Sequence, residues 1–120
     1  MKFTLSAVRT TTALVALSLA VAVPALAAPS HSTATAITVT ATDLHFKLSK
    51  TSTPHGTVTF TVVNKGKIAH DFKIAGKKTP LIQAGKSARL TVTLKAGKFP
   101  YLCTVPGHAA AGMKGTLTVT

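Results

Sequence analysis

Negative charge is scarce in this sequence. It contains no glutamate, and its two aspartates, Asp43 and Asp71, stand against fourteen lysines and arginines, so the formal net charge is +12 at pH 7. A surface this basic favours acidic partners, either an acidic protein or an anionic envelope polymer. Nucleic acid is not expected, because the basic residues are scattered among predicted strands and form neither a recognition helix nor an aromatic-rich groove.

Long apolar runs are also missing, except near the N-terminus. A positively charged start precedes an apolar run over residues 12–23, and small residues follow at positions 25 and 27. The run is short for a membrane span, so the pattern predicts a secretory signal peptide over residues 1–27. Cleavage is expected after Ala27, because cleavage one residue later would leave Pro29 at the first mature position. We therefore expect an exported protein, periplasmic or extracellular, with no membrane span after cleavage.

The mature chain is predicted to be one small domain. Its formal charge falls to +10, because the signal peptide removes two of the fourteen basic residues. Residues 28–36 are small and polar and predict a flexible leader. Residues 37–120 predict a single domain, which we expect to be monomeric. Any association with an anionic envelope would then be electrostatic.

Cysteine is nearly absent as well, since Cys103 is the only one. A single cysteine excludes an internal disulfide, which is the usual role of cysteine in exported domains. No cysteine follows the apolar run, which excludes a lipid-modified N-terminal cysteine. Taken alone, Cys103 is an intermolecular link, an inert buried thiol or a metal ligand.

Alternation of apolar residues with threonine recurs through the domain and is typical of half-buried antiparallel strands. The alternating runs are residues 37–40, 58–62, 90–94 and 117–119. Further strands are predicted at residues 44–48, 68–74 and 99–103. Glycine and proline turn signals separate these runs, and no segment has helical periodicity. The sequence therefore predicts an all-β sandwich of about seven to eight strands.

The lone cysteine opens a run of metal-binding residue types. Cys103, His108 and Met113 follow one another with four residues between each pair. Their thiolate, imidazole and thioether are donors that copper prefers. His70 lies upstream, near a predicted strand end. If it folds against this run, the chain has a His₂Cys set with a weak axial methionine, which is the donor set of a blue-copper site.

Two motifs carry a resemblance to a known family. They read Asn64-x-Gly66-x-x-x-His70-Asp71-Phe72 and Tyr101-x-Cys103-x₄-His108-x₄-Met113. With them, the segment from Ile37 to Thr120 resembles the cupredoxins, the type 1 blue-copper proteins similar to plastocyanin and azurin. The resemblance implies a Greek-key β-sandwich with one copper ion, Cu(I) or Cu(II), at one end. It also implies three equatorial ligands and one axial ligand: His70, Cys103, His108 and, in the axial position, Met113.

One position departs from the family pattern. Many family members carry asparagine after the first histidine, where its side chain ties the two ligand loops together, whereas this chain has Asp71. A carboxylate still accepts backbone N–H bonds. Its negative charge favours Cu(II), which predicts a lowered reduction potential.

Residues missing around the site narrow the function. A binuclear copper centre needs two cysteines, and a multicopper oxidase needs histidines beside the type 1 cysteine, where this chain has Leu102 and Thr104. A mononuclear site with all four positions filled leaves no open position for substrate. We therefore expect a one-electron carrier and not an enzyme.

Small residues surround His108 and predict a flat patch that a partner approaches closely. Lys65, Lys67 and Lys114 are placed to steer an acidic redox protein toward it. Two alternatives stay open. Copper sequestration or delivery in the envelope, without a redox partner, uses the same donors. A metal-free basic β-sandwich that binds polyanions explains the charge but not the Cys103 loop.

Overall fold

The computed structural model describes residues 13–16, 18–25 and 33–120. About half of the predicted signal peptide and about half of the predicted leader lie outside these described residues, and both stay predictions. Residues 13–16 and 18–25 adopt no regular secondary structure. Within the described ranges, no helix is long and apolar enough to cross a membrane.

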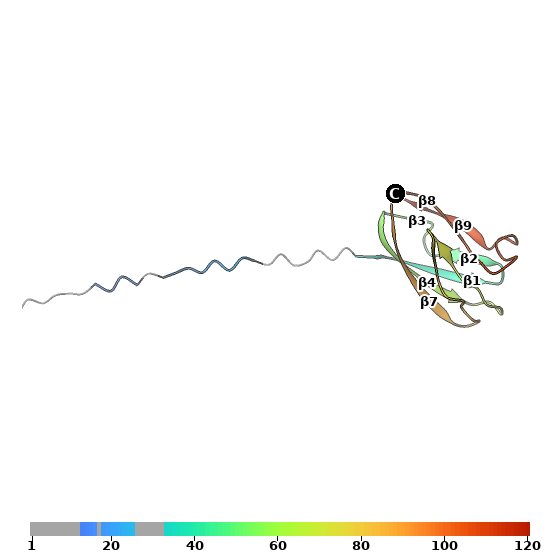
Figure 1. Cartoon of the computed structure of the whole chain (residues 1–120), viewed down its shortest axis with the longest axis horizontal. Helices are drawn as coiled ribbons and strands as arrows, with labels where there is room; N and C mark the ends of the chain where they lie inside the picture. The colour runs from blue at the N-terminus through green and yellow to red at the C-terminus, as the bar shows by residue number, and fades with distance from the viewer. Residues whose placement is uncertain (1–12, 17, 26–32) are drawn as a thin grey trace, which may run out of the picture.

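Residues 33–120 form two β-sheets that pack face to face (Figure 1). The four-stranded sheet has the order β2 (His45–Leu48), β1 (Thr35–Thr42), β4 (Gly56–Asn64) and β7 (Ser87–Leu94). The five-stranded sheet has the order β3 (Ser52–Thr53), β9 (Lys114–Val119), β8 (Gly97–Leu102), β5 (Lys73–Ile74) and β6 (Lys77–Lys78). The predicted all-β sandwich is confirmed.

The number and pairing of the strands differ from the prediction. The described residues contain nine strands, three of which are only two residues long. β1 pairs with β4 in parallel, with Ile37 opposite Phe60, and β3 pairs with β9 in parallel. Alternation fixes which side chains face the core, but it does not fix strand direction, so the antiparallel expectation was wrong for these pairs. β1 also begins at Thr35, two residues before the predicted start of the domain.

The strand predicted at residues 68–74 is the other correction. Only Lys73–Ile74 is strand, and His70 makes a single antiparallel bridge with Ile82. The backbone before His70 is held by side chains instead. Asn64 donates to the carbonyl of Ile68 at 2.8 Å, and Asp43 accepts from the N–H groups of residues 67 and 68. These bonds satisfy the backbone without a neighbouring strand.

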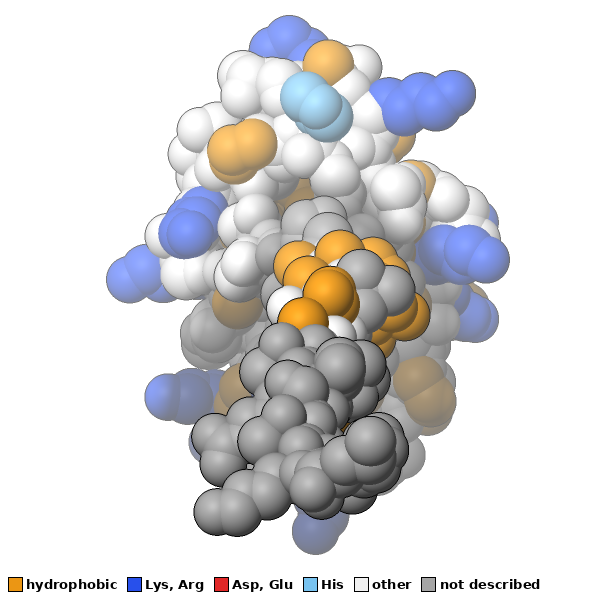
Figure 2. Space-filling model, turned by 90° about the vertical axis from the view of Figure 1, so that its left-hand side faces the viewer, with side chains coloured by type: hydrophobic (Ala, Val, Ile, Leu, Met, Phe, Trp, Pro, Cys, Tyr) orange, Lys and Arg blue, Asp and Glu red, His pale blue; other side chains and the backbone are white. Residues whose placement is uncertain are grey.

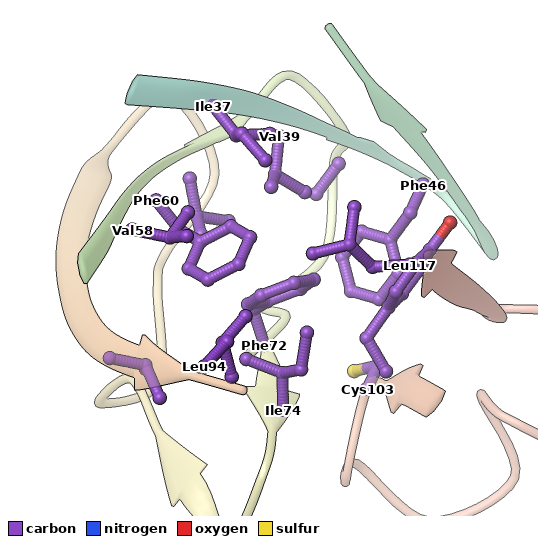
Figure 3. Packing of buried hydrophobic residues seen from close by; sticks show 14 of the residues in the cluster. Ile37, Val39, Phe46, Val58, Phe60, Phe72, Ile74, Leu94, Cys103 and Leu117 are labelled. Carbon is purple, nitrogen blue, oxygen red and sulfur yellow. The ribbon is translucent and has the colours of Figure 1, made fainter. Parts of the chain in front are cut away.

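The core lies between the inner faces of the two sheets (Figure 3). β4 alternates strictly, burying Val58, Phe60 and Val62 while its threonines face outward. Phe72 sits at the centre of an aromatic group, with its ring centroid 5.2 Å from that of Phe60. Burying one such side chain stabilises the fold by about 1.5–3 kcal/mol. Cys103 lies at the edge of the same cluster (Figure 3).

The outer faces carry the positive charge. Figure 2 views the end of the sandwich at which β1 begins, and it shows lysine and arginine side chains spread around the outline with no acidic side chain in view. Lys73, Lys98 and Lys114 are exposed on the five-stranded sheet. The four-stranded sheet presents mostly threonine, and cross-strand Oγ1 atoms of Thr59 and Thr91 are 3.3 Å apart.

Candidate metal centre

Three predicted ligands meet at one end of the sandwich. The Nδ1 atoms of His70 and His108 are 3.1 Å apart, and the Sγ atom of Cys103 lies 3.6 Å from Nδ1 of His108. One donor atom from each of the three residues lies within 4.8 Å of the others. His70 and Cys103 are buried and His108 is half-buried. Two imidazoles and a thiol converging at these distances suit a single soft or borderline ion, and the donor set fits copper.

His70 is positioned by the motif that precedes it. Asn64 is fully buried at the end of β4, and its amide donates to the carbonyls of Ile68 and Ile82, both at 2.8 Å. The side-chain oxygen of Asn64, Oδ1, accepts from the N–H of Gly66 at 2.9 Å. Ile82 in turn exchanges two backbone hydrogen bonds with His70. Asn64 therefore holds the two backbone segments that position the imidazole, the one before His70 and the one around Ile82.

A carboxylate holds the far side of the His70 ring. Oδ1 of Asp43, in the turn between β1 and β2, lies 3.1 Å from Nε2 of His70. The N–H of Lys67 and the His70 ring lower the pKa of Asp43, so this carboxylate is ionised and can only accept. Nε2 must then carry the proton, which leaves the lone pair of Nδ1 free for a metal. No sequence signal singled out Asp43, which lies 27 residues from His70.

The other donors come from the loop between β8 and β9, at the end of the sandwich opposite the start of β1 (Figure 1). The N–H of Cys103 donates to the carbonyl of Met113, and the N–H of Met113 donates to the carbonyl of His108. Gly107 has a φ of 84°, a left-handed conformation that glycine adopts without strain. The loop thus closes on itself through its own backbone.

Asp71 connects the segment that carries His70 with the segment that carries Cys103. From the sequence, we expect a carboxylate at this position still to accept backbone N–H bonds. Its Oδ1 accepts from the N–H of Thr104 at 2.6 Å, and its Oδ2 accepts from the Thr104 hydroxyl. Lys78 places its Nζ 3.9 Å from the same carboxylate. His70 and Cys103 each lie one residue from this connection. The effect of Asp71 on the reduction potential stays a prediction.

Met113 is fully buried, and its backbone is bonded to both Cys103 and His108. Its role as an axial ligand stays a prediction. Burial raises the pKa of the Cys103 thiol, so this thiol is protonated at neutral pH when no metal is bound. A metal that binds the thiolate must therefore displace a proton. His45 and His55 are exposed, and neither belongs to a metal-binding group within the described residues.

Comparison with known proteins agrees with this geometry. The family described as copper binding proteins, plastocyanin/azurin family, matches residues 30–120. Among solved structures, a dithionite-reduced auracyanin from the photosynthetic bacterium Roseiflexus castenholzii superposes with a TM-score of 0.63 and 26% identity, covering 72% of this chain and 98% of that one. A structure of auracyanin B gives the same TM-score with 28% identity, covering 72% and 89%.

Curated relatives match over shorter stretches. Auracyanin-B of Chloroflexus aurantiacus is 54% identical over 43 residues, which is 35% of this chain and 18% of that protein. The copper-resistant cuproprotein CopI of Vibrio cholerae is 32% identical over 90 residues, which is 57% of this chain and 53% of CopI. This chain therefore spans at most about half the length of these two relatives.

Proposed function

The chain belongs to the plastocyanin/azurin family of copper-binding proteins, and on that premise we propose that it is an exported one-electron carrier. One copper ion is its cofactor, held by His70, Cys103 and His108, with Met113 as the proposed axial ligand. The observation that carries the proposal is the convergence of three donor atoms within 4.8 Å at the end of a rigid sandwich.

Bound copper supplies one-electron chemistry by alternating between Cu(I) and Cu(II), both of which suit a His₂Cys set. The protein's contribution is to keep the donors still while the charge changes. Asn64 and the bridge to Ile82 hold His70, while backbone bonds within the loop hold the other donors. His108 is the one half-buried member of the trio, so its ring offers the shortest route for an electron to the surface.

Purified mature protein tests the proposal directly. Adding Cu(II) should give an intense blue or green colour, because the thiolate of Cys103 donates charge to Cu(II), and Cys103→Ala should abolish it. His55→Ala is the matched control, because His55 is exposed and its Nδ1 contacts only the Thr120 carbonyl. A colourless wild-type protein with weak copper binding would contradict the assignment.

An acidic redox protein is the proposed partner. Four residues stand side by side on the adjacent strands β6, β5, β8 and β9, next to the metal-binding loop between β8 and β9: Lys78, Lys73, Leu102 and Lys114. The three lysines are exposed. We call these three lysines the lysine row. Within residues 33–120, the exposed large apolar side chains are Leu44, Ile68 and Leu81. Leu44 follows Asp43, the N–H of Ile68 bonds to Asp43, and Leu81 precedes Ile82, so all three lie near His70.

Ionic strength tests this partner. Electron transfer to an acidic redox protein should slow as salt rises, because screening weakens the attraction between exposed charges. At low salt, the double variant Lys73→Gln/Lys114→Gln should transfer electrons to this partner more slowly than the wild-type protein. Lys47→Gln is the control, since Lys47 is exposed on the other sheet. Equal losses in the control and the double variant would remove the lysine row from the proposal.

Copper sequestration is a second candidate, favoured by the similarity to CopI of Vibrio cholerae. The ligand set is the same in both cases, so the discriminating property is retention of the metal. An electron carrier should pass through repeated oxidation and reduction without losing copper. Release of copper to a chelator in one oxidation state would favour sequestration or delivery.

A further inference from the structure

Both carboxylates of this basic chain lie beside the metal centre. Asp43 and Asp71 are the only acidic side chains among 120 residues. Asp71 bonds to Thr104, the neighbour of Cys103, and Asp43 bonds to His70. Within the described residues, no lysine or arginine side chain forms an ion pair with Asp43. Its contacts are therefore directed at the histidine and at the backbone that carries it.

We propose that Asp43 is a positioning residue that orients His70 and strengthens it as a copper donor, an inference that rests on His70 being a ligand. The carboxylate accepts the Nε2–H, fixing the tautomer in which Nδ1 faces Cys103 and His108. A carboxylate in this position makes the ring a stronger donor, as in other carboxylate–histidine–metal arrangements. Negative charge at this distance also favours Cu(II) over Cu(I), which lowers the reduction potential.

The turn that carries Asp43 is built for this contact. Asp43 and Leu44 are the two residues between β1 and β2, and Leu44 has a φ of 68°, a left-handed conformation that leucine rarely adopts. Backbone strain of this kind persists where the surrounding structure enforces it and concentrates at functional sites. Glycine at position 44 would avoid the strain.

Gly66 supports the same contact from the other side. A Cβ atom added to Gly66 would clash with Oδ1 of Asp43, so any side chain here would displace the carboxylate. The carboxylate also accepts from the N–H of Lys67 at 3.1 Å and of Ile68 at 3.4 Å. These bonds hold the segment before His70, so the experiment must separate an effect on the metal from simple stiffening of the loop.

Asp43→Asn makes that separation. The amide keeps the size of the side chain and an oxygen that accepts from the backbone, but it removes the charge. Thr42→Lys is the matched control. It makes the same change in net charge at the exposed residue next to Asp43, and it leaves the contact with His70 in place. In the copper-loaded protein, voltammetry should show a higher reduction potential for Asp43→Asn, by more than for Thr42→Lys. Asp43→Ala should weaken Cu(II) affinity by about 10- to 100-fold.

A second measurement does not depend on copper. In the copper-free protein, ¹⁵N NMR of the His70 ring should report a proton on Nε2, and Asp43→Ala should give a mixture of tautomers. The proposal is overturned if Asp43→Asn shifts the potential no more than Thr42→Lys, or if the His70 tautomer is unchanged in Asp43→Ala. A wild-type protein that forms no coloured copper complex defeats the proposed function instead, and the ring tautomer still decides the Asp43 contact.

Discussion

His70 and His108 turn the same ring nitrogen toward the metal centre, but the two rings differ on their other side. His70 is 0% exposed, and its Nε2 is bonded to Asp43. His108 is half-buried, and within the described part of the chain its Nε2 has no hydrogen-bond partner. One side of the site is therefore built for fixed geometry and the other for access.

The segments that carry the two histidines differ in the same way. His70 depends on partners distant in sequence, because Asn64, Ile82 and Asp43 come from three separate parts of the chain. The His108 loop bonds mainly to itself, from Cys103 to Lys114. The position of His70 thus depends on several distant parts of the chain, whereas the His108 loop, residues 103–114, is held mainly by its own hydrogen bonds.

Removing each ring in turn should test this contrast most strongly. His70→Gly and His108→Gly should both lose the colour of the copper-loaded protein. Added imidazole should restore it in His108→Gly, because that cavity opens to solvent, and should fail in His70→Gly, because that cavity is closed. Visible absorption during an imidazole titration measures both. Equal restoration in the two variants would show that exposure does not distinguish the two sites.

A smaller effect is expected when the distant contacts of His70 are cut. Asn64→Ala removes one buried hydrogen bond, to Ile82, and two partly buried ones, to Gly66 and Ile68, and should cost about 3 kcal/mol in the free energy of unfolding. Ala110→Ser, at an exposed position of the His108 loop, should stay within about 0.5 kcal/mol of wild type. Denaturant unfolding of the copper-free proteins gives both values. A small cost for Asn64→Ala would mean that the His70 segment is held locally after all.

The smallest effect concerns the connection between the two segments. Asp71→Asn keeps an oxygen that accepts from the Thr104 N–H while it removes the charge beside Cys103 and His70. We expect a higher reduction potential by voltammetry, because less negative charge disfavours Cu(II), with little change in stability. Thr116→Asn, exposed on β9, is a control for the chemistry of the amide. A potential that does not rise would count against an electrostatic role for Asp71.

The sequence identified the metal-donor residues more readily than the residues that hold them in position. Cys103, His108 and Met113 are close in sequence, and their side-chain chemistry is visible in the residue types alone. Asn64 and Gly66 belonged to a motif, but their physical roles emerged from the structure. Asn64 satisfies three backbone groups, and Gly66 leaves room for Asp43. The strand predicted over residues 68–74 was wrong for residues 68–72, because side-chain hydrogen bonds replace the strand ladder there.

The amino-acid sequence alone was enough to predict an all-β domain, the buried faces of its main strands and a set of donors suited to copper. These properties follow from residue type and short spacing. Three features became visible only in the folded chain: β1 runs parallel to β4, His70 meets Cys103 and His108, and Asp43 contacts the His70 ring although 27 residues separate them in sequence. Such contacts depend on how two sheets pack, and packing is set by the sum of many distant interactions and not by any one segment.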